Sequence, residues 1–272
     1  MGILQAILYG IVQGLTEFLP ISSSAHLRIV GEFLGRDPGA AFTAIIQLGT
    51  EAAVIVYFWR DIVRIVQRWF LGIFGRIPRS DADYRLGWLI IIGTIPVVII
   101  GYLLQDTITT TFRSLWFVAV TFVVFGILLG VADRYGRSTK TLTDMTVGQG
   151  IIYGIAQAFA LIPGVSRSGG TLTAGRLMGF TREAAARYSF LIAIPAVFGS
   201  GLFELYSTRH SGNPFGAGPT LVATIVSFVV GLAVIHYFLR YISRGSFLPF
   251  VIYRIIAGLV LAVLLASGVI AA

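Results

Sequence analysis

Two short polar segments with similar residues interrupt otherwise apolar sequence, about 144 residues apart. The first spans residues 13–26 and reads QGLTEFLPISSSAH, and the second spans residues 157–168 and reads QAFALIPGVSRS. Serine hydroxyls, a carboxylate, an imidazole and a guanidinium are costly in apolar surroundings, so such groups are candidates for function. A duplicated pair of interrupted apolar segments further predicts one polar site, formed where two halves of the chain meet.

The first segment contains a set of side chains suited to nucleophilic or acid–base chemistry. Ser23 and His26 are three residues apart, which places them on one face of a helix, where an imidazole can deprotonate a hydroxyl or protonate a leaving phosphate. We interpret Ser23 as the nucleophile and His26 as the acid or base, while attack by water or by His26 itself remains an open alternative. Gln13 and Glu17, four residues apart, share another face, where they are suited to hold a divalent metal, orient His26 or direct a water.

Both segments also predict helix starts that suit a phosphate. Pro20 ends one apolar segment, and the serines at 22–24 can cap the next helix. The free N–H groups and positive dipole of a helix start bind anions. The second segment adds Arg167, whose guanidinium can hold phosphate oxygens with two parallel hydrogen bonds. We therefore predict a phosphate or pyrophosphate site, and the further residues expected to contact the substrate are Gln13, Ser22, Ser24, Ser166, Ser168 and Thr171.

Structural roles compete with these assignments. A serine run after a proline often serves only as a helix cap, and Gln13 and Gln157 are equally suited to hydrogen bonds between helices. Arg254 begins the last apolar segment, so we expect its side chain to reach the membrane interface or to form a structural ion pair. His236 is expected to cap a helix or to reach the membrane interface. Glu51 is a further carboxylate within an apolar segment, and its relation to the site is open.

The composition indicates a polytopic membrane protein. Of the 272 residues, 56% are hydrophobic and only 12% are charged, whereas soluble domains average about 25% charged residues. The net charge of +8 arises from basic residues in loops between apolar segments, which favours contact with membrane lipids over nucleic acid. The chain has no cysteine, which excludes disulfides and thiolate metal sites.

The apolar segments predict an all-α fold with six transmembrane helices and two re-entrant helical hairpins. Residues 1–272 are expected to form a single membrane domain, with a first repeat at 1–135 and a second at 148–272. Each repeat holds one hairpin and three spans, and because three is odd, the second repeat must be inverted relative to the first. The expected spans are 42–59, 86–104, 114–132, 188–206, 219–241 and 250–270, and the expected hairpin segments are 2–19 with 25–34 and 151–162 with 170–180.

Basic loop residues predict the orientation of the chain. Arginines are concentrated in the loop after the first span, whereas the loops expected on the opposite side of the membrane contain little beyond Arg113 and Arg209. Since cytoplasmic loops carry an excess of lysine and arginine, the arginine-rich face is expected to be cytoplasmic. Both termini, the first hairpin and the active site would then face outside, and the second hairpin would open inward. The arginines of the loop after the first span are Arg60, Arg64, Arg68, Arg76, Arg79 and Arg85.

These motifs resemble those of the undecaprenyl-diphosphatase family, also called the bacitracin-resistance or BacA/UppP family, over essentially the whole chain. The residues that match the family's site are Glu17, Ser23, Ser24, His26, Ser166, Arg167 and Ser168. The chain departs from the pattern at Gln13, where many relatives carry a second glutamate, and this weakens any mechanism that needs two carboxylates. The motifs are QGLTEFLP at 13–20, SSSAH at 22–26 and PGVSRSG at 163–169, supported by QLGT at 47–50, SFLIAIP at 189–195 and SFLPFVIYR at 246–254.

The resemblance implies a bacterial plasma-membrane enzyme that hydrolyses undecaprenyl diphosphate to undecaprenyl phosphate and inorganic phosphate. This reaction recycles the lipid carrier for peptidoglycan synthesis and confers bacitracin resistance. The resemblance also implies a divalent cation, Mg²⁺ or Ca²⁺, with Glu17 as the candidate ligand. A flippase or transporter of polyprenyl phosphate is the alternative, since inverted repeats suit it, but a carrier needs no Ser–His pair beside a glutamate. The fold permits a homodimer, although no residue specifies one.

Overall fold

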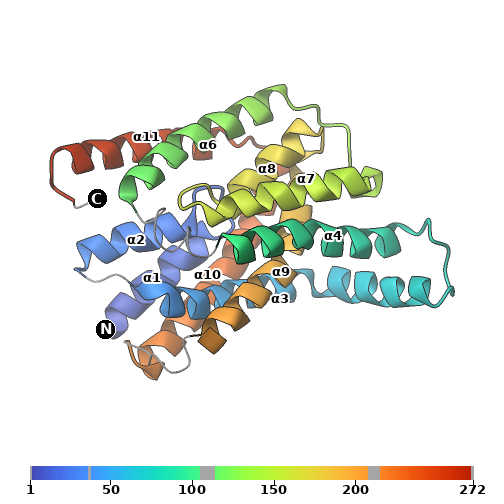
Figure 1. The fold of residues 1–272 in the computed structure, drawn as a ribbon, viewed down its shortest axis with the longest axis horizontal. Coiled ribbons are helices and arrows are strands. Elements are labelled where there is room, and N and C mark those ends of the chain that lie inside the picture. Colours follow the sequence, from blue (N-terminus) through green and yellow to red (C-terminus); the bar gives the residue numbers. More distant parts are fainter. Residues whose placement is uncertain (1, 36–37, 105–113, 208–214, 271–272) are drawn as a thin grey trace.

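The computed structural model describes residues 2–35, 38–104, 114–207 and 215–270, which contain ten α-helices and no β-strand. Six of these helices are long and apolar enough to cross a membrane, so the predicted all-α membrane class is confirmed and the six predicted spans correspond to six candidate membrane helices. The loop residues Arg113 and Arg209 lie outside the described residues. The six helices are α3 (Gly39–Ile73), α4 (Ala82–Leu103), α6 (Leu115–Tyr135), α9 (Arg182–Ser207), α10 (Ala217–Ile242) and α11 (Leu248–Ala266) (Figure 1).

Four shorter helices form two pairs with matching positions in the sequence. They are α1 (Ile3–Thr16) with α2 (Ser23–Phe33), and α7 (Val147–Ala158) with α8 (Arg167–Leu177). Helices α1 and α7 begin 144 residues apart, at residues 3 and 147, and α2 and α8 do the same, at residues 23 and 167. Both α2 and α8 have 11 residues. In Figure 1 the two turns within these pairs lie in the interior of the molecule.

Each short pair is held by close contact with one long helix. Helix α1 packs against α10, and α7 packs against α4. Gly10 and Gly14 of α1 face Val226 and Val230 of α10 so closely that a Cβ on either glycine would overlap them. Gly154 of α7 lies equally close to the backbone of α4. Small residues allow this close helix packing in a membrane, where apolar burial alone does not draw helices together.

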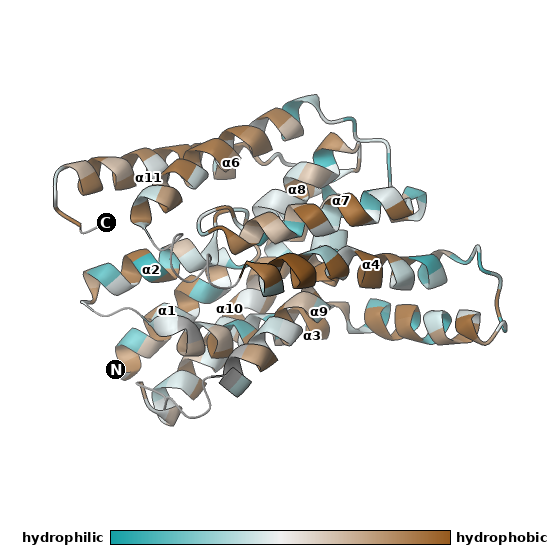
Figure 2. Ribbon diagram, viewed as in Figure 1, coloured by the Kyte–Doolittle hydropathy of each residue, from teal (hydrophilic) through white to brown (hydrophobic). Residues whose placement is uncertain are grey.

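The surface of the long helices suits contact with lipid. Large apolar side chains such as Ile99, Val120 and Leu259 are each more than half exposed, at 52%, 57% and 55%. Figure 2 shows α4, α6 and α11 as mostly hydrophobic, whereas α8 carries many pale and hydrophilic residues. An exposed apolar surface of this extent would aggregate in water, so the protein is a multi-pass membrane protein.

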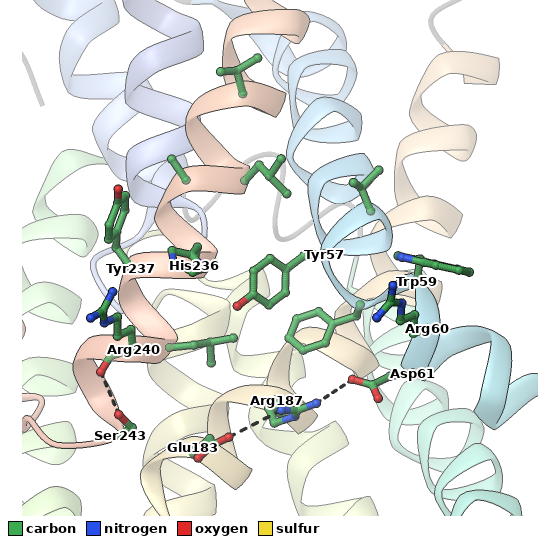
Figure 3. Close-up of a pocket in the computed structure, with 16 residues that line it drawn as sticks. Tyr57, Trp59, Arg60, Asp61, Glu183, Arg187, His236, Tyr237, Arg240 and Ser243 are labelled. Carbon is green, nitrogen blue, oxygen red and sulfur yellow. Dashed lines mark hydrogen bonds and ion pairs between the residues drawn. The ribbon is translucent and has the colours of Figure 1, made fainter.

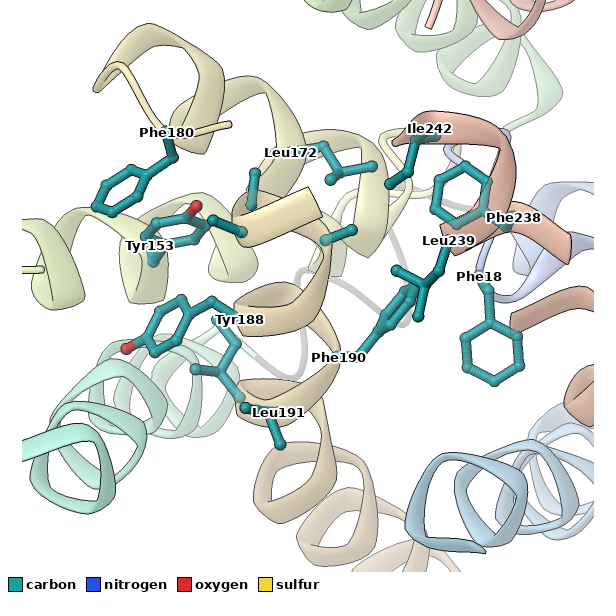
Figure 4. Close-up of a cluster of buried hydrophobic side chains, with 14 of the residues drawn as sticks. Phe18, Tyr153, Leu172, Phe180, Tyr188, Phe190, Leu191, Phe238, Leu239 and Ile242 are labelled. Atoms are coloured by element: carbon teal, nitrogen blue, oxygen red, sulfur yellow. The ribbon is translucent and has the colours of Figure 1, made fainter. Parts of the chain in front are cut away.

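Aromatic side chains dominate the largest core cluster (Figure 4). The Tyr153 and Tyr188 rings meet edge to face, with centroids 4.7 Å apart, and the Tyr188 hydroxyl donates to the Leu89 carbonyl at 2.7 Å. Phe190 packs edge to face on Phe18, with centroids 5.5 Å apart. This cluster joins α7, α8, α9 and α10 to the turn that follows α1, and so fixes the elements that carry the polar residues.

Candidate active site

The turn that joins α1 to α2 meets the turn that joins α7 to α8. The Ser168 hydroxyl donates to the Leu19 carbonyl across the contact at 2.9 Å. Glu17 ends α1, Ser23 is the first residue of α2, and Arg167 is the first residue of α8. The meeting of the two turns therefore brings together three of the side chains predicted to carry the chemistry.

Both turns hold a serine in a backbone conformation that L-residues rarely adopt. Ser22 has φ of 72° and Ser166 has φ of 69°, and they are the two non-glycine residues with positive φ in the described ranges. The Ser166 hydroxyl accepts a hydrogen bond from the Gly169 N–H at 3.1 Å, which caps α8. The Ser22 hydroxyl makes no such cap and lies 3.3 Å from the Ser24 hydroxyl instead. The start of α2 therefore lacks the side-chain cap that closes the start of α8.

Glu17 is the centre of the hydrogen-bond network. Its Oε2 accepts from the Ser23 hydroxyl at 2.6 Å and from Gln13 Nε2 at 2.8 Å. Its Oε1 accepts from Arg167 Nη2 at 2.6 Å and from Gln47 Nε2 at 3.3 Å. The Glu17 side chain is only 3% exposed. A buried carboxylate with a serine hydroxyl on one oxygen and a guanidinium on the other is suited to accept the serine proton.

A second carboxylate, Glu51 of α3, lies in the same cluster. Arg167 Nη2 donates to Glu51 Oε1 at 3.0 Å, so one guanidinium nitrogen serves both carboxylates. Three buried atoms here have no hydrogen-bond partner among the described residues: Glu51 Oε2, Gln13 Oε1 and Arg167 Nη1. Buried polar atoms normally have partners. The cluster therefore has two oxygen acceptors and one guanidinium donor left to contact a bound group.

The donor atoms of this cluster suit a hard divalent cation. The unpartnered oxygens are Glu51 Oε2 and Gln13 Oε1, and Mg²⁺ and Ca²⁺ take oxygen ligands. Each Glu17 oxygen already accepts two hydrogen bonds, so Glu17 would bind a cation only in exchange for one of them. In the part of the chain that the structure describes, no group of three or more His, Cys, Asp or Glu side chains gathers around one point. A cation here would therefore depend on two carboxylates, on neutral oxygens and on phosphate oxygens, a set that Mg²⁺ sites often use.

His26 does not pair with Ser23 in this structure. Its Nδ1 lies 2.7 Å from the Ser22 carbonyl, to which it must donate. Its Nε2 lies 2.6 Å from the Tyr253 hydroxyl, and in the neutral ring it accepts from that group. The His26 and Tyr253 rings are stacked, with centroids 5.7 Å apart. The expected Ser23–His26 hydrogen bond is therefore replaced by two others, because the Ser23 hydroxyl turns back across the turn to Glu17.

Arg254 contradicts its predicted role, since it reaches neither the interface nor a carboxylate. Its side chain is fully buried, and its guanidinium donates only to main-chain carbonyls at 2.8–3.3 Å. One of these carbonyls belongs to Pro20 of the first turn, and two belong to Gly164 and Val165 of the second. Gly164 is required there, because it has φ of 86° and a Cβ would overlap the Thr121 hydroxyl. Arg254 thus links both turns to α6, through the carbonyls of Thr121 and Phe122.

The remaining predicted substrate contacts divide into engaged and accessible groups. The hydroxyls of Ser166 and Ser168 are engaged with each other at 3.1 Å and with main-chain atoms. Thr171 is fully buried and bonds to Ser189 and to the Arg167 carbonyl. Ser24, in contrast, is exposed. The accessible hydroxyls thus lie at the start of α2.

Four contributors to this site were missed or left open by sequence reasoning: Gln47, Thr50, Glu51 and Tyr253. The first three lie on one face of α3, and Thr50 accepts from Gln13 Nε2 at 3.3 Å. The run QLGTE at 47–51 inside an apolar segment was the available signal. Tyr253 lies in the supporting run SFLPFVIYR at 246–254, but an aromatic residue near a span end is ordinary, so the run did not indicate its contact with His26.

Known proteins resemble this chain over its full length. The family model described as bacitracin resistance protein BacA matches residues 6–260. The undecaprenyl-diphosphatase of Micrococcus luteus is 62% identical over 274 residues, covering 99% of each chain. That of Clavibacter michiganensis subsp. michiganensis is 60% identical over 272 residues, covering 100% of each chain. That of Renibacterium salmoninarum is 60% identical over 274 residues, covering 99% of this chain and 98% of its own. The chain therefore belongs to the bacitracin resistance protein BacA family.

Proposed function

We propose that this protein hydrolyses undecaprenyl diphosphate to undecaprenyl phosphate and inorganic phosphate, and so recycles the lipid carrier for cell-wall synthesis and confers bacitracin resistance. Relatives with the name undecaprenyl-diphosphatase match it at about 60% identity over the whole chain. The six apolar helices suit a membrane-bound lipid substrate. These relatives favour the phosphatase over the alternative, a carrier of polyprenyl phosphate.

One contact carries the proposed mechanism: the Ser23 hydroxyl donates to Glu17 Oε2 at 2.6 Å. Glu17 takes the proton as the Ser23 oxygen attacks the terminal phosphorus of the diphosphate. The new bond joins Ser23 Oγ to that phosphorus, and the bond that breaks joins the same phosphorus to the bridging oxygen. Undecaprenyl phosphate leaves with the electron pair of that bond. Water then attacks the phosphorus of the phosphoserine, and the bond between that phosphorus and Ser23 Oγ breaks. Glu17 returns its proton to Ser23 Oγ, the proton of the water passes to phosphate or solvent, and inorganic phosphate is released.

Arg167 supplies positive charge where negative charge develops during the transfer. Its Nη2 holds Glu17 and Glu51, and its buried Nη1 has no partner among the described residues. We assign Nη1 to a phosphate oxygen of the substrate. Phosphoryl transfer gains most of its rate from positioning and from charge stabilisation of this kind.

Glu17, Glu51 and Gln13 would hold the divalent cation, Mg²⁺ or Ca²⁺, that the family resemblance implies. Such an ion neutralises phosphate charge when it is bound. The unpartnered oxygens of Glu51 and Gln13 support this assignment.

His26 is assigned a positioning role in this mechanism, which differs from the acid–base role expected from the sequence. Its ring joins the Ser22 carbonyl to the Tyr253 hydroxyl, and it therefore fixes the turn that presents Ser23. Its removal should lower turnover through disorder of that turn.

We also propose that α1–α2 and α7–α8 are re-entrant hairpins of an inverted repeat, with repeats at 1–135 and 148–272. The matching 144-residue offsets of the helices support a duplication. In Figure 1, α1 begins and α11 ends at the left, whereas the arginine-containing loop between α3 and α4 lies at the right. With that loop in the cytoplasm, the termini and the active site face outside.

Cysteine labelling tests this topology, since the chain has no cysteine of its own. Arg76→Cys lies in the loop between α3 and α4, and Ser267→Cys follows α11; both residues are exposed. A membrane-impermeant thiol reagent applied outside intact cells should label only Ser267→Cys. Labelling of both from outside would reject the inverted arrangement.

Phosphate release from undecaprenyl diphosphate in detergent tests the mechanism. Ser23→Ala should lower turnover on the order of 10³-fold or more, as expected when a nucleophile is removed. Ser80→Ala is the control, because it deletes an exposed serine hydroxyl in the loop between α3 and α4, outside the site, and it should stay within a few-fold of wild type. Full activity of Ser23→Ala would move the attack to water. Absence of phosphate release from the wild-type protein would reject the proposed function itself.

A further inference from the structure

A cavity of about 1080 Å³ opens between α3, α9 and α10 (Figure 3). We refer to it as the α3–α9–α10 cavity. None of Glu17, Ser23, Glu51 or Arg167 is among the residues that line it. The proposed phosphatase mechanism therefore gives this cavity no role.

Aromatic side chains fill the space between this cavity and the candidate active site. Phe58 lines the cavity and packs on Phe190, with centroids 6.2 Å apart. Phe190 packs in turn on Phe18, the neighbour of Glu17, with centroids 5.5 Å apart. A ligand in the cavity would thus be separated from the catalytic carboxylate by three packed rings.

The wall of the cavity carries more positive than negative charge. Arg187 is paired with Asp61 at 2.6 Å and lies 3.6 Å from Glu183. Arg60 and Arg240 also line the cavity and have no ion pair among the described residues. Figure 3 shows these two arginines on opposite sides of Tyr57 and His236. Two unpaired guanidinium groups on the wall of one cavity, one on α3 and one on α10, give this wall a positive charge that suits an anionic group.

Another part of the cavity wall is apolar and continues into the lipid-facing surface of α3 and α10. Val56, Val229 and Tyr237 line the cavity and are 48%, 57% and 67% exposed. Val56 lies on α3, and the other two lie on α10. A site for a free ion has no need of such a wall, whereas an amphiphile with an anionic head and an acyl chain matches both parts.

We propose that the α3–α9–α10 cavity binds an anionic phospholipid, with the headgroup at the part of the wall that carries Arg60 and Arg240 and an acyl chain along Val56 and Val229. Basic pockets between transmembrane helices are suited to anionic lipid headgroups. Trp59, over which the Arg60 guanidinium lies at 5.5 Å, is also suited to the headgroup level of a bilayer. This lipid site is independent of the proposed phosphatase activity.

Native mass spectrometry of the delipidated full-length protein tests the proposal. Phosphatidylglycerol and phosphatidylcholine with the same acyl chains are titrated separately into the wild type and into Arg60→Gln/Arg240→Gln. The wild type should prefer phosphatidylglycerol. The double variant should bind it about 25-fold more weakly, which corresponds to about 1 kcal/mol for each arginine at 1.4 kcal/mol per tenfold.

A matched control removes two arginines from exposed positions on the same face. Arg76→Gln/Arg79→Gln deletes the same charge from the loop between α3 and α4, where both residues are exposed. It should keep the wild-type preference for phosphatidylglycerol. Equal weakening in this variant would show that general charge attracts the lipid, and it would reject the site.

A second variant tests the cavity without changing its charge. Ala233→Trp places a large side chain at an exposed position on the cavity wall, and it should also weaken phosphatidylglycerol binding. Unchanged binding in this variant would overturn the proposal. Displacement of the lipid by millimolar inorganic phosphate would likewise overturn it, because the occupant would then be a free anion.

Discussion

The two central turns share a backbone path but differ in their chemistry. Ser22 and Ser166 both have positive φ and both precede an 11-residue helix. At the next position the first turn has Ser23, whereas the second has Arg167. The residue corresponding to Glu17, counted 144 positions on, is Leu161. The first turn thus carries the Ser23 hydroxyl and the Glu17 carboxylate, and the second carries the Arg167 guanidinium that binds this carboxylate.

The same backbone motif, a serine with positive φ before a short helix, thus serves two different tasks within one site. In the second turn the serine hydroxyls cap α8 and bind the first turn, so only the Arg167 side chain remains for substrate. In the first turn the cap is absent, and the main chain at the start of α2 remains available to a phosphate. We therefore expect substitutions in the second turn to affect structure and charge, and substitutions in the first to affect chemistry.

The largest effect is expected at Arg254, which holds both turns. Arg254→Met removes the donors to five buried carbonyls. The carbonyls of Thr121 and Phe122 lie within α6 and keep helical partners, whereas those of Pro20, Gly164 and Val165 would be left unsatisfied. Each unsatisfied group costs about 1–3 kcal/mol, so the variant should lose at least about 3 kcal/mol and unfold at a lower temperature than the wild type. Thermal unfolding in detergent is the measurement. Arg244→Met, at an exposed position after α10, is the control and should unfold at the wild-type temperature. A wild-type unfolding temperature for Arg254→Met would show that its hydrogen bonds to the two turns do not stabilise the fold.

The next effect is expected at Arg167, the charge of the second turn. Arg167→Lys keeps the charge but loses the planar fork that reaches Glu17 and Glu51 and that, in the proposed mechanism, also holds a phosphate. The expected loss is about 2–4 kcal/mol of transition-state stabilisation, or roughly 30- to 1,000-fold in kcat/KM for phosphate release. Arg182→Lys, which alters an arginine paired with Asp133 outside the turns, is the matched control. Near-normal turnover of Arg167→Lys would show that charge alone is sufficient.

A smaller effect is expected at Glu51, which distinguishes a cation ligand from a partner of Arg167. Glu51→Gln removes one of two carboxylates that share Arg167 Nη2. If Glu51 holds the cation, the Mg²⁺ or Ca²⁺ concentration for half-maximal activity should rise roughly 10- to 100-fold, the range seen when a metal site loses a supporting group. Turnover at saturating cation should recover much of its value. An unchanged cation dependence with low turnover would assign Glu51 to Arg167 alone.

The smallest effect compares the two strained serines directly. Ser166→Ala deletes the hydroxyl that caps α8 and should lower stability by about 1 kcal/mol, or roughly 2–4 °C in the unfolding midpoint. Ser22→Ala deletes a hydroxyl without a cap bond and should change the midpoint by less than about 1 °C. Equal shifts in the two variants would remove the structural distinction between the turns.

Much of the fold could be predicted from the sequence because its signals are local. Six apolar segments of about 20 residues predicted α3, α4, α6, α9, α10 and α11, and the structure confirms them as candidate spans. The interrupted segments predicted short second segments at 25–34 and 170–180, and the structure places helices at Ser23–Phe33 and Arg167–Leu177. Hydropathy and helix capping depend on neighbours in the chain, so a single sequence contains them.

The site could be predicted only in part because its contacts are distant in sequence. Glu17 and Arg167 are 150 residues apart, and Arg254 and Pro20 are 234 residues apart. Helical spacing suggested that Ser23 and His26 form a pair, but spacing gives no direction for a side chain in the first turn of a helix. The Ser23 hydroxyl has a charged acceptor in Glu17, and a hydrogen bond to a carboxylate is stronger than one to a neutral ring.

The contacts of Arg254 have a consequence for how the two halves could diverge. A guanidinium that binds carbonyl oxygens recognises the path of the main chain and is indifferent to side-chain identity, since every residue has a carbonyl. After a duplication, the residues at these turns could change from serine to arginine, or from glutamate to leucine, while the same arginine kept both turns in place. The shared anchor would have left each copy free to specialise, and an asymmetric catalyst could arise from two nearly identical ancestors.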